Sequence, residues 1–177
     1  MQENLSCALI QGIDYGAALK NVDVLGLSCC EDHPREICGT LSLKAEHELC
    51  LPDGSLRYDQ QGFLSLKPTP FLIETAFMAG IAIGAASQSK LVLSDDRASV
   101  IAMKYALMLA PDIKPYLMFV CPDYLDLNIT TSGGCVCALG MKLIDASLQM
   151  LKDMKTFAEA KVAVANDGPG ADIQVEA

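Results

Sequence analysis

The stretch that decides the fold is residues 71–120, which read FLIETAFMAGIAIGAASQSKLVLSDDRASVIAMKYALMLAPDIKPYLMFV. Its apolar start predicts a helix over 71–87, and the short run KLVLS predicts a strand over 90–94. A second helix is expected over 98–109, because Pro111 stops it, and a further strand over 116–121. Helices that alternate with apolar strands in this way indicate an α/β fold with a mainly parallel sheet.

The flanking segments extend the same pattern. We expect a helix over 5–20, a strand over 22–27 and a long amphipathic helix from Gly133-Gly134 to about residue 161. Residues 28–70 lose the pattern and form a long excursion with a hairpin around Pro52-Asp53-Gly54. The prediction is one three-layer α/β domain over 1–164, a short mainly parallel sheet flanked by helices, and a disordered acidic tail over 165–177.

Composition excludes several classes of protein. The chain has 177 residues, 51% of them hydrophobic and 20% charged, so it can bury a core and is not a low-complexity sequence. A net charge of -9 argues against nucleic acid and anionic bilayers as partners. The first residues carry no basic cluster ahead of an apolar run, which predicts a cytoplasmic protein. The apolar run over 71–86 is shorter than the roughly 20 residues that span a bilayer, so we expect a buried helix and no membrane.

Candidate site residues follow the predicted strands. Parallel sheets bind ligands at the carboxyl ends of their strands, which here are followed by residues 28–33, 94–97 and 121–126. We expect these segments to share one rim, with the amides of Gly133 and Gly134 as a further wall.

A second informative run covers residues 133–162 and reads GGCVCALGMKLIDASLQMLKDMKTFAEAKV. It is considered together with residues 71–119. Both runs resemble the nicotinate-nucleotide:dimethylbenzimidazole phosphoribosyltransferase family, which activates the lower base of cobamides. The first matches G-x-x-I-A-A-M-A-G-A-I-x-G-A-A and the segments after it; the second matches G-E-G-T-G-A-A-L-A-x-x-L-I-D-A-A and the helix after it. The resemblance implies an α/β fold, a nicotinate nucleotide or an aromatic base as ligand, and no required cofactor.

Two motifs of the family are changed in this chain. Gly133 stands where the family has the catalytic Glu of G-E-G-T-G, and residues 28–36, SCCEDHPRE, replace the phosphate-contacting G-E-M-G-I-G-N-T-T. Asp95 or Asp96 is then the candidate catalytic base or charge stabiliser. The candidate substrate contacts are the remaining polar groups near the strand ends, namely Ser94, Arg97, Ser132, Gly133 and Gly134. The alternative for the two aspartates is that one of them caps the helix that begins near Arg97.

Two other functions stay open. The first is a metal or redox protein, because Cys29, Cys30, His33 and Cys38 lie within ten residues, and thiolate and imidazole suit zinc or an iron–sulfur cluster. Cys135 and Cys137 add two thiols, although neither group has the C-x-x-C spacing, and the sequence favours packing as small buried side chains over a ligand role.

The second is a non-catalytic partner subunit. The resemblance implies a homodimer, or a heterodimer with a related subunit, through contacts between long helices. Small residues over 79–84 would let such a helix approach another closely, either between two chains or inside one. The methionines of the apolar stripes, among them Met118, Met150 and Met154, are expected to fill the core.

Overall fold

The computed structural model of the chain describes residues 4–28, 47–120 and 134–154. The chain falls into two compact units, residues 1–142 and residues 143–177. The predicted end of the domain near residue 164 and the predicted tail lie outside the described residues.

A three-stranded parallel sheet lies at the centre of the first unit. Its strands are β1 (Val24–Leu27), β2 (Leu91–Ser94) and β3 (Leu117–Phe119), in the order β1-β2-β3. The register pairs Leu27 with Ser94 and Ser94 with Phe119, so all three strands end at one edge. The predicted α/β fold with a short parallel sheet is confirmed, and each strand is shorter than the sequence predicts.

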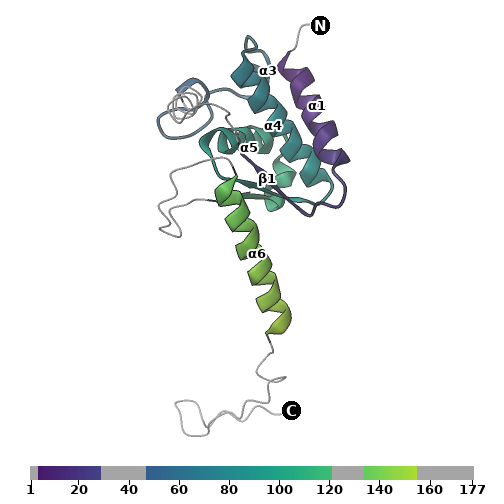
Figure 1. The fold of residues 1–177 in the computed structure, drawn as a ribbon. Helices are drawn as coiled ribbons and strands as arrows, with labels where there is room; N and C mark the ends of the chain where they lie inside the picture. The colour runs from purple at the N-terminus through teal and green to yellow at the C-terminus, as the bar shows by residue number, and fades with distance from the viewer. Residues whose placement is uncertain (1–3, 29–46, 121–133, 155–177) are drawn as a thin grey trace, which may run out of the picture. The chain divides into compact units, whose positions relative to one another are not determined.

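Two helices on one side of the sheet pack against each other at unusually close range. They are α1 (Leu5–Ala18) and α4 (Pro70–Ser87), which run side by side in Figure 1. Gly12 of α1 meets Gly80 of α4, and a Cβ atom at Gly80 would lie 2.9 Å from Gly12 Cα. Gly16 lies against the backbone of Ile81 and Ala85, and Gly84 lies against the backbone of Ile13 and Ala17. The small residues of α4 therefore serve packing inside the chain.

Helix α4 contains the apolar run over 71–86. By length and hydropathy it could cross a membrane, but 61% of it is buried inside the protein. Helix α4 has no distinct polar face, because neighbouring elements cover it on several sides.

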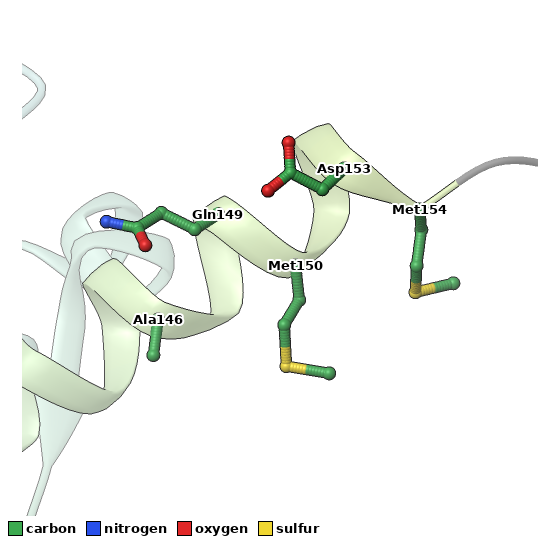
Figure 2. Close-up of a pocket in the computed structure, with 5 residues that line it drawn as sticks. All are labelled: Ala146, Gln149, Met150, Asp153 and Met154. Atoms are coloured by element: carbon green, nitrogen blue, oxygen red, sulfur yellow. The ribbon is translucent and has the colours of Figure 1, made fainter.

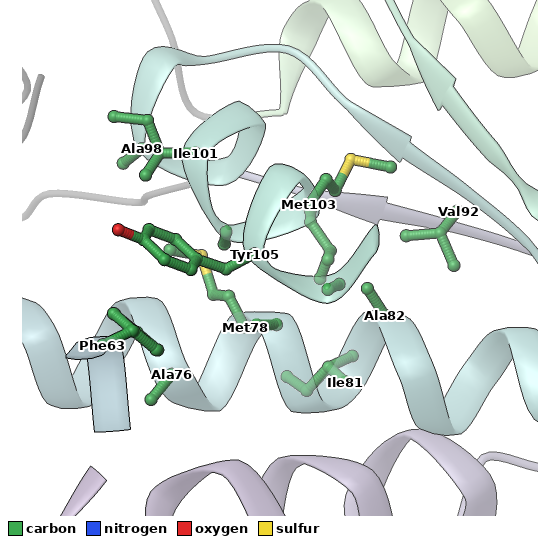
Figure 3. Close-up of a cluster of buried hydrophobic side chains, with 14 of the residues drawn as sticks. Phe63, Ala76, Met78, Ile81, Ala82, Val92, Ala98, Ile101, Met103 and Tyr105 are labelled. Atoms are coloured by element: carbon green, nitrogen blue, oxygen red, sulfur yellow. The ribbon is translucent and has the colours of Figure 1, made fainter. Parts of the chain in front are cut away.

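The main core lies between α4, α5 (Arg97–Leu109) and β2 (Figure 3). Val92 points to this side of the sheet with Ala82 and Met103. Tyr105 is fully buried and stacks on Phe63, with ring centroids 4.0 Å apart.

The other face of the sheet is covered by the first two turns of α6 (Cys135–Asp153). A Cβ atom at Gly26 would lie 2.9 Å from Cys137 Cβ, and one at Gly140 would lie 3.0 Å from Val120 Cγ2. Helices thus cover both faces of the sheet within the first unit, which gives the three layers that the sequence predicts.

The excursion between β1 and α4 holds more structure than predicted. Helix α3 (Gln60–Leu64) was not expected, and it brings Phe63 into the core beneath Tyr105. The predicted hairpin is present, because Cys50 and Leu56 form an antiparallel bridge around the turn at 52–54. Lys104 Nζ donates to Gly54 O at 2.7 Å, which ties this turn to α5. A 3-10 helix, η1 (Pro111–Tyr116), takes up the start of the predicted strand 116–121.

The second unit begins within α6, which ends at Asp153 instead of the predicted residue 161. Its apolar side chains are exposed in the described part of the chain, at 64% for Met150 and 67% for Met154. The prediction that these two methionines fill the core is therefore wrong, and it is also wrong for Met118, which is 44% exposed on the edge strand β3.

Candidate functional site

The ends of β1 and β2 bring polar residues together, as the parallel sheet predicts. Ser28 follows β1, and residues 94–97 end β2 and begin α5. The register places these ends side by side, and Val120 N, just after β3, donates to Ser94 O at 2.8 Å. We call this cluster the strand-end rim, and its described members are Ser28, Ser94, Asp95, Asp96, Arg97, Gly134 and Cys137.

Asp96 caps helix α5. Its Oδ1 accepts from Ser99 N at 2.7 Å, and Ser99 Oγ accepts from Asp96 N at 3.3 Å, which makes a reciprocal capping box. Its Oδ2 accepts from Ser28 Oγ at 2.8 Å. The capping role left open by the sequence thus belongs to Asp96.

Ser28 joins three elements of the rim. Besides donating to Asp96, its Oγ accepts from Gly134 N at 3.0 Å. Gly134 has a φ of 84°, a left-handed conformation that glycine adopts without strain, and α6 begins at the next residue. The sequence placed Ser28 in the rim segment 28–33 but gave this serine no role of its own.

Asp95 differs from Asp96 in its contacts. Its Oδ2 accepts from Cys137 N in the first turn of α6 at 3.1 Å. Its Oδ1 is buried and has no hydrogen-bond partner among the described residues, and the same holds for the hydroxyl of the fully buried Ser94. A buried acceptor without a donor costs free energy, and among the described residues Asp95 Oδ1 is such an acceptor.

Cys137 lies beneath these carboxylates. Its thiol is buried, and its Sγ lies 3.8 Å from Leu27 O. Burial, followed by the negative charges of Asp95 and Asp96, raises the pKa of this thiol to about 12. Cys137 is therefore a protonated, buried packing group at neutral pH.

Arg97 is the first residue of α5 and its side chain is exposed. Ser132 and Gly133 lie outside the described residues, as does the predicted loop 121–126. So do the four candidate metal ligands, Cys29, Cys30, His33 and Cys38. Within the described residues, no three His, Cys, Asp or Glu side chains are grouped to hold a metal ion.

The second unit has a surface hollow of its own. It is lined by side chains along one side of α6 alone, as Figure 2 shows: Ala146, Gln149, Met150, Asp153 and Met154. None of the predicted site residues lines it, and a single helix face does not enclose a small molecule.

The chain is similar in sequence to curated proteins that share one name. It is 32% identical over 107 residues to the nicotinate-nucleotide–dimethylbenzimidazole phosphoribosyltransferase of Geotalea uraniireducens, covering 51% of this chain and 30% of that protein. The enzyme of the same name from Geobacter metallireducens is 31% identical over 111 residues, which are 54% of this chain and 31% of that protein. The similarity predicted from the sequence motifs is confirmed, and it spans about a third of the length of these relatives. No family model matches the chain.

Solved structures agree on the fold. The nicotinate-nucleotide–dimethylbenzimidazole phosphoribosyltransferase of Thermus thermophilus superposes with a TM-score of 0.63 at 18% identity, over 91% of this chain and 59% of that one. A structure of CobT from the same organism gives a TM-score of 0.62 at 19% identity, over 90% of this chain and 60% of that one. The α/β architecture is therefore shared with these enzymes.

Proposed function

We propose that this relative of the nicotinate-nucleotide–dimethylbenzimidazole phosphoribosyltransferases is a phosphoribosyltransferase-like domain that binds a nicotinate nucleotide or an aromatic base. The ligand would lie at the strand-end rim. Cobamide lower-ligand synthesis is the process to which the sequence similarity points.

The observation that carries this proposal is the unused acceptor of Asp95. Its Oδ1 is buried at the carboxyl end of a parallel strand, where α/β sheets bind ligands. An aromatic azole presents a ring N–H that can donate to such an oxygen. When a base of this type becomes a nucleophile it must lose that proton, and a carboxylate is a suitable acceptor.

The remaining rim residues would hold Asp95 in place. Cys137 N fixes its other oxygen at 3.1 Å, and Ser28 links the α5 cap to the entry of α6. Asp96 is committed to capping, so we propose it as a positioning residue and Asp95 as the residue that contacts the base.

The proposed ligand class fits the charge of the whole chain. With a net charge of -9, the protein suits a small molecule better than nucleic acid or an anionic membrane. We propose a cytoplasmic location, and the proposed binding requires no metal or cofactor.

The test is thermal unfolding of the reduced protein with added ligands. Dimethylbenzimidazole or nicotinate mononucleotide at about 100 times its dissociation constant should add roughly 2.7 kcal/mol to the free energy of unfolding. Asp95→Asn should lose the stabilisation by the base, whereas Asp112→Asn, which alters an exposed aspartate of η1, should keep it. If no ligand shifts the transition and a chelator lowers it, the metal hypothesis for Cys29, Cys30, His33 and Cys38 replaces this proposal.

A second candidate function is the non-catalytic partner subunit, and one observation favours it. The described part of α6 in the second unit exposes large apolar side chains: Leu143, Leu148, Met150, Leu151 and Met154, between 46% and 69% exposed. A contiguous apolar helix face of this kind marks a protein contact.

Sedimentation velocity at two protein concentrations tests this function. We expect a dimer that Leu151→Lys dissociates, because the lysine would bring a charge into the contact. Gln149→Lys, at a polar position of the same helix, is the control. A chain that sediments as a monomer at both concentrations would refute self-association.

A further inference from the structure

We draw no further inference here: the strongest candidate, the exposed apolar surface of helix α6 over residues 143–154, carries nothing beyond the self-association already considered, because nothing in the described part of the chain shows what covers it.

Discussion

Cys135 and Cys137 are two residues apart on α6 and differ in their exposure to solvent. Cys135 is exposed, whereas Cys137 is 2% exposed beneath Asp95 and Asp96. The pKa of the Cys137 thiol is raised to about 12 by burial first and by the two carboxylates second. At the residue scale, the position of a cysteine relative to the sheet therefore decides its reactivity.

Alkylation should distinguish the two thiols. We expect iodoacetamide at pH 8 to modify Cys135 at least a hundredfold faster than Cys137, because the reagent reacts with accessible thiolate. Fragment-ion mass spectrometry of the peptide that holds both residues gives the two rates. Similar rates in the folded protein would contradict the burial of Cys137, and similar rates in urea are the control.

The same thiol makes stability fall at alkaline pH. In the unfolded chain Cys137 loses its proton near its ordinary pKa of 9.0, whereas in the folded protein it keeps the proton to about pH 12. The folded state therefore binds more protons in this window, and the free energy of unfolding falls as pH rises from 9 towards 12. Urea unfolding of the wild type and Cys137→Ala should show a smaller pH dependence in the variant, and equal slopes would contradict the raised pKa.

Sequence reasoning reached Asp95 and Asp96 as a pair but could not separate their roles. The two residues have the same side chain at adjacent positions after one strand. Their difference comes from partners far along the chain: Ser28 lies 68 residues from Asp96, and Cys137 lies 42 residues from Asp95. No local pattern carries that information.

Helices α1 and α4 pack with their backbones in direct contact. Cβ atoms added at Gly12, Gly16, Gly80 or Gly84 would press on carbonyl oxygens of the opposite helix. The sequence contains both G-x-x-x-G pairs, at 12–16 and at 80–84, and leaves open whether they pack within a chain or between chains.

Gly12→Ala separates packing from helix propensity. Propensity alone predicts that alanine stabilises a helix by about 1 kcal/mol relative to glycine. Here a Cβ at Gly12 would overlap Phe77 O, so we expect a loss of about 1–3 kcal/mol in the free energy of unfolding. Urea denaturation measures both effects, and Gln11→Ala, on the exposed side of α1, should change stability by less than about 0.5 kcal/mol. A more stable Gly12→Ala would contradict the close packing.

Helices α4 and α5 were predictable, whereas the short helices α3 and η1 were not. Helices α4 and α5, of 18 and 13 residues, are largely apolar and are bounded by clear caps or proline. Helix α3 has five residues, too few for a periodic signal, and it is held by its Asp59 cap and by the packing of Phe63 on Tyr105. Its formation depends on α5, which no window around residue 60 contains.

At the scale of the whole molecule, the alternation of helices and apolar strands along the chain was enough to predict the fold class. The parallel order β1-β2-β3 then placed the three strand ends at one edge, as expected. What the pattern could not supply is the pair of hydrogen bonds at Ser28, whose hydroxyl donates to Asp96 and accepts from the amide of Gly134, 106 residues away.

The most direct test of the central claim is nuclear magnetic resonance of the 15N-labelled protein during titration with dimethylbenzimidazole. If the base binds at the strand-end rim, the amide signals of Ser99, Gly134 and Cys137 shift together and saturate at one stoichiometric site. The amides of Cys7 and Leu72, which are held by the caps of α1 and α4, should stay unchanged. Unchanged rim signals at saturating base, or shifts confined to other elements, would contradict the account.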